Sequence, residues 1–332
     1  MNNNLIQENV SLADKNWFCT GGHAKFFVEP ETSHQFAEAL AYANLHDLAI
    51  FVLGEGANIL ISDEGFDGLV IRPHNKNIEI VAQDATHGFV RAGAGVNFGK
   101  LINFCLDQNL SGLEEFSGIP GTVGGSVFIN IHFFQFLLSQ FLHEGTIINR
   151  STGIVQTVSP DWFNFGYNHS TLHTQEYFLI EAIFKLKKVP VVEAAYSRGR
   201  RDEMIRYRGH RYPKGRTCGS FFRNFHEHEV SLIKNGKKVI YAAYYLDTLG
   251  IKGQLSYGNA SISHQHANMI VTHDGATSVD VINLARTMQE LVYEKFGLLL
   301  EPECRLVGFH KYPLRSIQYF SALSQDRQVT IY

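Results

Sequence analysis

Apolar residues along the first 130 residues recur with two different periods. A helical period predicts helices, and short apolar runs bounded by turn residues predict strands. The expected helices are 32–47, with Phe36, Leu40 and Ala43 inward, and 97–110, with Leu101, Phe104, Cys105 and Leu106 inward and an end near Gly112. The expected strands lie within residues 48–54, 68–72, 77–82 and 89–95. The pattern therefore predicts an α+β region.

Strands and helices are also expected after Gly145. The predicted elements are a hairpin over 145–159 that turns at Thr152 and Gly153, a strand over 177–189, an arginine-rich helix over 191–210, and a helix over 237–250 that Gly250 ends. No internal repeat is found. The second half of the chain is thus of mixed α and β character as well.

The clearest helix is predicted over residues 276–297. Thr277 or Ser278 can cap its N-terminus, Asp280 lies in its positive first turn, and Gly297 closes it. Its apolar residues recur at helical spacing, which predicts one buried face. That face is expected to carry Ile282, Ala285, Met288 or Gln289, Val292 and Phe296.

The composition narrows the class of protein. At 332 residues and 45% hydrophobic, the chain is long enough for a large core and for two or three domains. A net charge of −3 and a pI near 6.6 favour neither nucleic acid nor a membrane surface as partner. No apolar run reaches the roughly 18 residues of a membrane span, and residues 1–18 do not resemble a secretory signal.

The cysteines and histidines are candidates for redox or metal chemistry. The cysteines are far apart and form no CxxC, which indicates reduced thiols in a cytoplasmic protein. They are Cys19, Cys105, Cys218 and Cys304. The pairs His226/His228 and His264/His266 have a spacing that puts both rings on one face of a strand. No cysteine or carboxylate completes a ligand pattern, so we expect no metal.

Three glycine-rich loops lie within 75 residues of one another. They are LGEGAN (53–58), RAGAG (91–95) and SGIPGTVGG (117–125), each at the end of an apolar run. Successive N–H groups in such loops form a concavity that suits a pyrophosphate. None of them matches GxGxxG between a strand and a helix, and none contains GK[ST]. One such loop would usually be a tight turn, but three together favour a dinucleotide cradle.

These loops and several later segments resemble one known family. FVLGEGANILISDEGFDGLVIR and GLEEFSGIPGTVGGSVFIN are similar to the FAD-binding part of the UDP-N-acetylenolpyruvoylglucosamine reductases, in their short form. The resemblance continues in order through WFCTGGHAKFFVEP, CGSFFRNF, SISHQHANMIVTHDGATSVDVI and FGLLLEPECRLVGF, spanning about residues 10–309. It implies an α+β chain, with an FAD-binding domain of the vanillyl-alcohol-oxidase type and a C-terminal α+β substrate-binding domain.

The resemblance also implies domain boundaries and cofactors. The expected parts are FAD-binding subdomains at 1–75 and 76–190, a substrate-binding domain at 191–309 and a tail of unassigned role at 310–332. Non-covalent FAD and NADPH are the implied cofactors. The FAD-binding residues would be Leu53, Gly54, Glu55, Gly56, Ala57, Asn58, Ile59, Ser117, Gly118, Ile119, Pro120, Gly121, Thr122, Gly124 and Gly125.

Four residues match family positions that act on the substrate. By resemblance Ser220 donates the proton to C2 of the enolpyruvyl group, and Glu303 helps to hold the enol form. Asn224 and Arg305 match substrate-binding positions, Arg305 near the phosphates of the nucleotide sugar. On their own, Ser220 would be a turn serine, Glu303 a surface residue and Arg305 a solvated surface charge, so the motifs around them carry the assignment.

The sequence departs from the family pattern at three places. Asn168 stands where an arginine is expected to stabilise the enolate, and a neutral amide is no equivalent of a bidentate cation at a carboxylate. His169, if protonated, or Arg223 could partly replace that arginine. Bulky apolar residues fill NIHFFQFLLSQFL (130–142), where glycines are expected beside the flavin. Ala57 lacks a hydroxyl that the family often supplies.

The predicted function is NADPH-driven, FAD-dependent reduction of UDP-N-acetylglucosamine enolpyruvate to UDP-N-acetylmuramate, in peptidoglycan precursor synthesis. One alternative is a diverged flavoprotein oxidoreductase with a different, for instance nucleotide-linked, substrate. Another is a non-catalytic protein that binds flavin or a UDP-sugar. We expect a cytoplasmic monomer without nucleic-acid or membrane partners, and the tail 310–332 is expected to make a packing or oligomer contact.

Overall fold

The computed structural model describes residues 5–319, which form two compact units. The first unit comprises residues 5–10, 24–56 and 66–209, and the second comprises 11–23, 57–65 and 210–319. The contacts group residues 191–209 with the first unit. The domain boundaries expected at residues 75, 190 and 309 stay a prediction.

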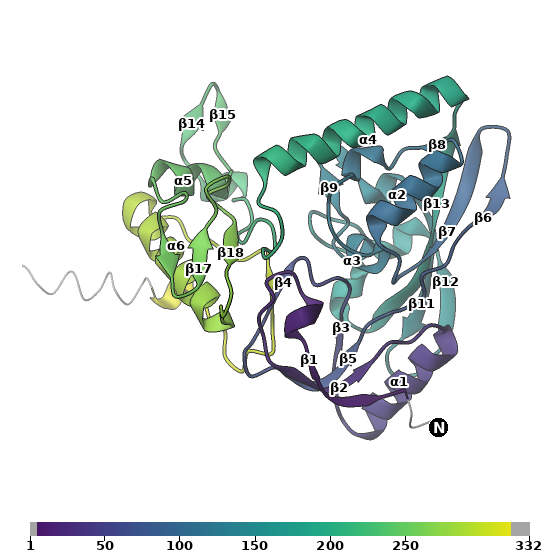
Figure 1. Ribbon diagram of the computed structural model, residues 1–332, viewed down its shortest axis with the longest axis horizontal. Coiled ribbons are helices and arrows are strands. Elements are labelled where there is room, and N and C mark those ends of the chain that lie inside the picture. Colours follow the sequence, from purple (N-terminus) through teal and green to yellow (C-terminus); the bar gives the residue numbers. More distant parts are fainter. Residues whose placement is uncertain (1–4, 320–332) are drawn as a thin grey trace, which may run out of the picture. The chain divides into compact units, whose positions relative to one another are not determined.

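The first unit begins with a four-stranded sheet of order β1-β2-β5-β3, shown at the lower right of Figure 1. Its strands are β1 (Gln7–Ser11), β2 (His23–Val28), β5 (Phe66–Ile71) and β3 (Ala49–Val52). Helix α1 (Ser33–Leu45) buries Phe36 and Leu40 against it. Thr32 caps the helix by accepting from the Gln35 N–H, and Gln35 caps in return. The predicted helix and the strands within 48–54 and 68–72 are confirmed.

A larger antiparallel sheet forms most of the first unit, in the order β12-β11-β13-β7-β6, with β8 added to β13. Its strands are β6 (Ile78–Gln83), β7 (His87–Gly93), β8 (Leu110–Ser111), β11 (Leu142–Asn149), β12 (Val155–Val158) and β13 (Tyr177–Lys188). Helices α2 (Phe98–Asp107) and α3 (Val123–Phe128) share its core (Figure 1). The hairpin predicted at Thr152 and Gly153 is confirmed, with Ile148 opposite Val155.

The arginine-rich helix α4 (Val191–Arg211) packs on the first unit through few apolar side chains. Ala194 and Met204 are buried, whereas most of the helix is polar. The Arg200 guanidinium instead contacts both oxygens of Glu115 at 2.6 and 2.8 Å, which fixes the helix beside residues 114–116. The predicted helix over 191–210 is therefore confirmed.

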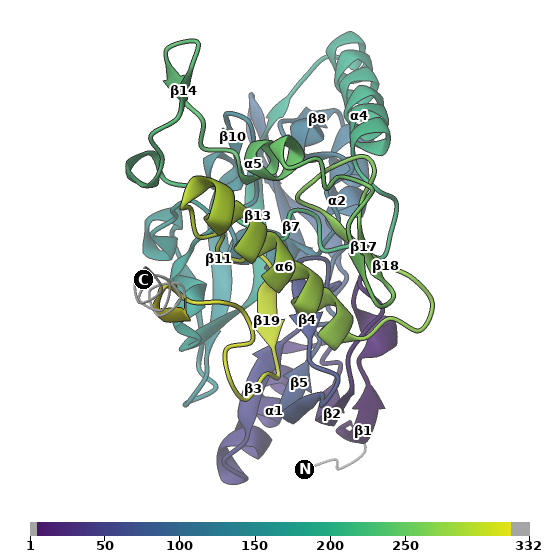
Figure 2. The same cartoon turned by 90° about the vertical axis from the view of Figure 1, so that its left-hand side faces the viewer.

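The second unit contains several short strands and the helices α5 and α6. They are β4 (Ile59–Ile61), β14 (Ile233–Lys234), β15 (Lys237–Lys238), α5 (Ala242–Thr248), β16 (Ser256–Tyr257), β17 (Ala260–Ile262), β18 (Ile270–Thr272), α6 (Ser278–Phe296) and β19 (Arg305–Val307). Strand β19 pairs in parallel with β4, so residues far apart in sequence lie side by side (Figure 2). Helices α5 and α6 and strands β17 and β18 share one apolar core.

Helix α6 has the predicted ends. Thr277 caps it together with Asp280, and Gly297 ends it with φ of 68°. Met288 and Gln289 are both buried: Met288 packs in the apolar core, and the Gln289 amide donates to the carbonyls of Leu300 and Arg315. Part of the predicted tail is thereby bound to α6, and residues 320–332 lie outside the described residues.

The helix predicted over 237–250 is shorter than expected, and its first part was wrong. Asn235 and Gly236, with φ of 50° and 74°, form the tight turn of the hairpin β14–β15. An Asn-Gly pair favours this turn, so Lys237 and Lys238 form a strand instead of a first helical turn. Helix α5 begins at Ala242, and Gly250 lies just beyond its end with φ of 72°.

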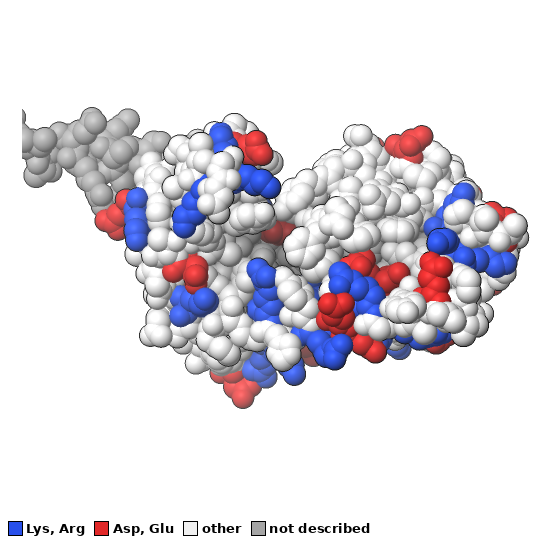
Figure 3. Space-filling view, turned by 90° about the horizontal axis from the view of Figure 1, so that it is seen from above, with Lys and Arg blue, Asp and Glu red and all other residues white. Residues whose placement is uncertain are grey.

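Charges are mixed on the face seen in Figure 3. Lysine and arginine side chains lie among aspartate and glutamate there, and uncharged residues cover most of this face. This matches the small net charge. Among the helices of residues 5–319, none has the length and apolar character needed to cross a bilayer.

Candidate active site

The three glycine loops meet in the first unit. The Glu55 carboxylate accepts from the Asn97 amide at 2.6 Å and from the Gly121 N–H at 3.1 Å, which joins the first loop to the third. The Gly124 N–H donates to the Ala94 carbonyl at 2.9 Å, which joins the third loop to the second. The cradle expected from the sequence therefore exists as one cluster of loops.

The geometry of this cluster fits a pyrophosphate. Within the described part of the chain, the successive N–H groups of Gly54, Glu55 and Gly56 donate to no protein acceptor. Gly56 has φ of 67°, a conformation that glycine adopts readily and that turns successive N–H groups to one side. A Cβ built on Gly121 would meet no atom within 4 Å, so open space adjoins this loop. The residues present can thus hold the diphosphate of FAD.

The remaining predicted FAD-binding residues lie on either side of a unit boundary. Ser117 to Gly125 lead into α3, where the Thr122 hydroxyl accepts from the Gly125 N–H at 3.2 Å. Leu53 is buried at the end of β3. Ala57, Asn58 and Ile59 belong to the second unit by their contacts.

We expect Gly124→Val to lower flavin affinity at least tenfold. A Cβ at Gly124 lies 3.1 Å from the Ala94 carbonyl oxygen and 3.2 Å from its Cβ, so a branched side chain pushes the second and third loops apart. Gly121→Val acts differently, because φ of 139° strains any branched residue. The measurement is flavin content after dialysis. Gly199→Val is the control, since no atom lies near a Cβ there; full flavin in both loop variants contradicts the cradle.

Ser220 and Glu303 come together within the second unit. Residues 220–223 run antiparallel to residues 301–304, with Phe222 opposite Pro302. The N–H of Glu303 donates to the Phe221 carbonyl at 2.8 Å, and the N–H of Arg223 donates to the Glu301 carbonyl at 2.9 Å. Both Ser220 and Glu303 are half-buried. The two segments that carry the family motifs therefore form one element of the site.

A buried asparagine that the sequence analysis did not select holds the segment 220–223. The Asn268 side chain accepts from the Phe222 N–H at 3.1 Å and donates to the Phe222 carbonyl at 2.7 Å. Its own backbone carbonyl accepts from the Phe221 N–H at 2.8 Å. Gly219, with φ of 79°, turns the chain just before Ser220. Ser220 thus stands on backbone that is fixed on both sides.

Arg305 and Asn224 extend the same element. The Arg305 N–H donates to the Asn58 carbonyl at 3.0 Å, so the predicted substrate residue lies beside the predicted FAD-binding residue. Burial lowers the pKa of the Arg305 guanidinium below its usual range. The Asn224 amide oxygen accepts from the Ala242 N–H at 3.3 Å, which gives that side chain a role at the start of α5.

Arg223 is not available as a substitute for the missing arginine. Its guanidinium donates to Glu229 at 2.8 Å and to Glu301 at 2.6 Å, so two carboxylates neutralise its charge. These contacts hold the pKa of Glu229 at about 2, mainly through the hydrogen bond from Arg223. The expectation that Arg223 could stabilise an enolate was therefore wrong, because Glu229 and Glu301 are bound to it already.

The Glu229–Arg223 pair makes stability depend on pH. Because the pKa of Glu229 is about 2 in the folded chain and 4.5 otherwise, its contribution is complete above pH 4.5 and falls as pH approaches 2. We expect Glu229→Gln to lower the free energy of unfolding at pH 6, by a difference that shrinks between pH 5 and 3. Urea unfolding measures it, with Glu227→Gln in the same turn as control. A difference independent of pH contradicts the pairing.

Asn168 lies in a two-residue turn of the first unit. Gly166 and His169 face each other across it, the Gly166 N–H donating to the His169 carbonyl at 3.0 Å. Asn168 has φ of 51°, a left-handed conformation that asparagine tolerates better than most residues. His169 is exposed and stacks on His173 at 4.9 Å between ring centroids. The local backbone thus favours asparagine for a reason besides chemistry.

The bulky apolar stretch 130–142 contains a small hairpin, in which β9 (His132–Phe133) pairs with β10 (Phe136–Leu137). Phe134 lies in its turn with φ of 50° and is 72% exposed. A bulky residue in this conformation is rare and strained. His132 packs against Tyr167, next to Asn168, and burial lowers the pKa of His132. The two departures from the family pattern are therefore neighbours in the fold.

The histidine pairs do not lie on strands. His226 precedes a short helical turn that contains His228, with the two ring centroids 5.5 Å apart, and His264 and His266 lie in the loop between β17 and β18. Within residues 5–319, no three His, Cys, Asp or Glu side chains gather as metal ligands would. Asn97 was not predicted as a site residue, because it contacts Glu55 from 42 positions away.

Comparison with known proteins gives consistent relationships. Residues 24–159 match the model of an FAD binding domain, and residues 211–307 match that of the UDP-N-acetylenolpyruvoylglucosamine reductase C-terminal domain. The reductase of that name from Acaryochloris marina is 33% identical over 93% of this chain and 94% of its own. That from Prochlorococcus marinus is 30% identical over 93% of this chain and all of its own.

A solved structure agrees. The crystal structure of UDP-N-acetylenolpyruvylglucosamine reductase from Thermus caldophilus superimposes with a TM-score of 0.73 at 28% identity, covering 91% of this chain and 99% of that chain. The predicted α+β class is confirmed: an FAD-binding domain precedes the C-terminal domain of these reductases. The chain belongs to the family of UDP-N-acetylenolpyruvoylglucosamine reductases.

Proposed function

We propose that this protein reduces UDP-N-acetylglucosamine enolpyruvate to UDP-N-acetylmuramate as an FAD-dependent oxidoreductase that uses NADPH. Its family membership supports the reaction. The observation that carries the proposal is the pairing of residues 220–223 with 301–304, which puts the predicted acid and the predicted glutamate on adjoining backbone.

Each predicted site residue has its own role in the proposed reaction. The chemistry that bound FAD supplies is transfer of a hydride from NADPH to the enolpyruvyl double bond. Ser220 gives its hydroxyl proton to C2 as charge builds there, and Glu303 hydrogen-bonds the enol form of the substrate carboxyl. Arg305 and Asn224 bind the nucleotide sugar. The backbone N–H groups of the glycine loops hold the diphosphate of FAD.

The surroundings of the predicted site residues affect how well they can stabilise charge. The half-buried position of Ser220 and Glu303 keeps them partly out of water, where hydrogen bonds to a developing charge are stronger. Asn268 fixes the backbone of Phe222, so Ser220 needs little reorganisation when the substrate binds. Asn168 offers an amide donor to the substrate carboxylate, which stabilises negative charge less than an arginine would.

Two half-reactions test the proposal. NADPH should bleach the flavin absorbance in a stopped-flow instrument, and the enolpyruvyl UDP-sugar should then restore it. Bleaching by NADPH without reoxidation by that substrate would show a flavoprotein with another substrate. A purified protein without flavin absorbance, even after incubation with FAD, would contradict the proposal altogether.

One observation favours a second candidate, a flavoprotein oxidoreductase with a different, for instance nucleotide-linked, substrate. Asn168 and the strained Phe134 lie on two turns joined by the His132–Tyr167 contact, which is 4.8 Å between ring centroids. Both departures thus change one wall of the first unit. Reoxidation by other enolpyruvyl or nucleotide-linked acceptors, compared at equal concentrations, distinguishes this candidate from the first.

The cellular setting follows from the reaction. UDP-N-acetylmuramate is a peptidoglycan precursor, so the protein would serve cell-wall synthesis, with consequences for cell shape and division. Cys105, Cys218 and Cys304 are buried free thiols, which supports a reducing compartment, the cytoplasm. We further propose that it acts as a monomer, since one chain carries all the predicted site residues.

A further inference from the structure

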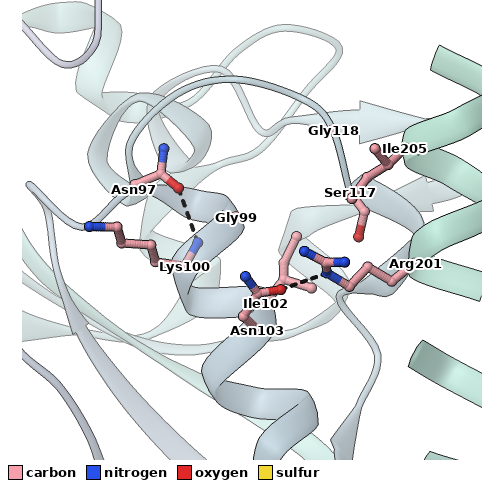
Figure 4. A pocket seen from close by; sticks show the side chains of 9 residues that line it. All are labelled: Asn97, Gly99, Lys100, Ile102, Asn103, Ser117, Gly118, Arg201 and Ile205. Carbon is pink, nitrogen blue, oxygen red and sulfur yellow. Dashed lines mark hydrogen bonds between the residues drawn. The ribbon is translucent and has the colours of Figure 1, made fainter. Parts of the chain in front are cut away.

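A cavity of about 180 Å³ lies in the first unit, apart from the residues assigned to substrate chemistry. The first turn of α2, residues 117–118 and helix α4 surround it (Figure 4). None of its lining residues belongs to the loop 53–58 or to the stretch 119–125, which form the rest of the proposed FAD cradle. It is lined by Asn97, Gly99, Lys100, Ile102, Asn103, Ser117, Gly118, Arg201 and Ile205.

A buried hydroxyl without a protein partner lines the cavity. Ser117 is 2% exposed, and within residues 5–319 its Oγ has no hydrogen-bond partner. Figure 4 shows this hydroxyl pointing towards the guanidinium of Arg201. Because a buried polar atom normally has a partner, the Ser117 hydroxyl indicates a ligand or ordered water in the cavity.

Backbone donors adjoin the same space. Helix α2 has ten residues, and Asn97 caps it by accepting from the Lys100 N–H at 3.0 Å. In the described chain, the N–H groups of Gly99 and Gly118 have no acceptor. Gly118 has φ of 80°, and Gly99 lies in the first helical turn, where the helix dipole favours an anion. Neither residue has a side chain that could cover its N–H group.

Arg201 supplies the positive charge. Its Nε donates to the Asn103 amide oxygen at 2.6 Å, which fixes the guanidinium in the cavity wall. Its Nη1 donates to the exposed Asp202 at 2.7 Å, and Nη2 has no acceptor in the described chain. The Lys100 side chain is exposed and extends away from Arg201 in Figure 4, so its charge acts from a greater distance.

We propose that this cavity binds a phosphate group. The lining offers a hydroxyl, two N–H groups and a guanidinium edge, which together suit a small oxyanion with several acceptor oxygens. The volume would hold about six waters at roughly 30 Å³ each, enough for one phosphate with some solvent. Two sources share this chemistry: free inorganic phosphate, and the 2′-phosphate of NADP. The cavity shares Ser117 and Gly118 with the residues predicted to bind FAD, whereas the proposed function assigns no ligand to its other side, which α2 and α4 form with Gly99, Asn103 and Arg201.

Calorimetric titration of the FAD-loaded protein with inorganic phosphate tests the site. We expect one phosphate per chain, about tenfold weaker binding in Arg201→Gln and several-fold weaker binding in Ser117→Ala, from loss of charge-assisted hydrogen bonds. Arg206→Gln is the matched control, because Arg206 is exposed on the same helix and does not line the cavity. Its affinity should equal that of the wild type.

Several results would overturn the proposal. The first is that phosphate gives no heat of binding with the wild-type protein, and the second is that Arg201→Gln binds phosphate with unchanged affinity. The third is that Arg206→Gln weakens phosphate binding as much as Arg201→Gln does, which would indicate a general effect of the positive charge of the helix. Thermal melts show whether each variant folds; if Arg201→Gln does not fold, unchanged affinity in Ser117→Ala overturns the proposal by itself.

Competition separates the two sources. Phosphate titrations are repeated with saturating NADP⁺ and, separately, with NAD⁺, neither of which reduces the flavin. If NADP⁺ alone displaces phosphate, the cavity takes the 2′-phosphate. If neither displaces it, the cavity takes free phosphate. Both results support a phosphate site, and the flavin content of each variant shows separately whether the proposed FAD cradle is intact.

Discussion

Ser220→Ala should leave reduction of the flavin by NADPH unchanged and slow reoxidation by the enolpyruvyl substrate about a thousandfold. The proton that Ser220 gives is needed only when the substrate is reduced, so the loss belongs to one half-reaction. Glycine at position 219 and the hydrogen bonds from Asn268 fix the backbone around this residue, so alanine should leave the fold intact. Single-turnover stopped-flow traces measure the two halves separately.

Two comparisons make this result specific. Ser256→Ala removes a hydroxyl from an exposed strand of the same unit and should change neither half-reaction. The flavin spectrum of Ser220→Ala should match that of the wild type. If both half-reactions slow equally in Ser220→Ala, the serine positions other groups and is not the acid.

The fold was predictable where a single local rule decided it. Thr277 caps α6 as expected, and Gly297 ends it in the left-handed conformation. The prediction of a helix over 237–241 was wrong because two local rules competed there. Its apolar residues suggest a helix, yet Asn235 and Gly236 favour a tight turn, and the hairpin leaves the helix to begin at Ala242.

The candidate site was predictable only where a motif carried it. Ser220 and Glu303 are 83 positions apart, and no spacing rule indicates that residues 220–223 pair with 301–304; the resemblance supplied both. Asn268 and Asn97 were missed because their roles rest on contacts between distant segments. Arg223 was misjudged for the same reason: charge is visible in a sequence, but the two carboxylates that neutralise it are not.

Asn168→Arg should raise the rate of flavin reoxidation by the enolpyruvyl substrate about a hundredfold, with a smaller change in apparent affinity. A cation here would stabilise the enolate more than the ground-state carboxylate, so the gain belongs to the rate. The backbone acts against the change, because φ of 51° suits asparagine and costs an arginine free energy. The measurement is single-turnover reoxidation in both proteins.

Asn168→Gln separates charge from shape in this experiment. Glutamine meets the same strain at φ of 51° and is longer than asparagine, yet it carries no charge. We expect it to be no faster than the wild type, so that any gain in Asn168→Arg comes from the cation. If arginine gives no gain although the wild type turns over, the wall formed by Phe134, His132 and Tyr167 holds the substrate carboxylate elsewhere, and asparagine belongs to a rebuilt pocket. If neither protein reoxidises with this substrate, the enolpyruvyl UDP-sugar is not what the protein reduces, and the second candidate function takes its place.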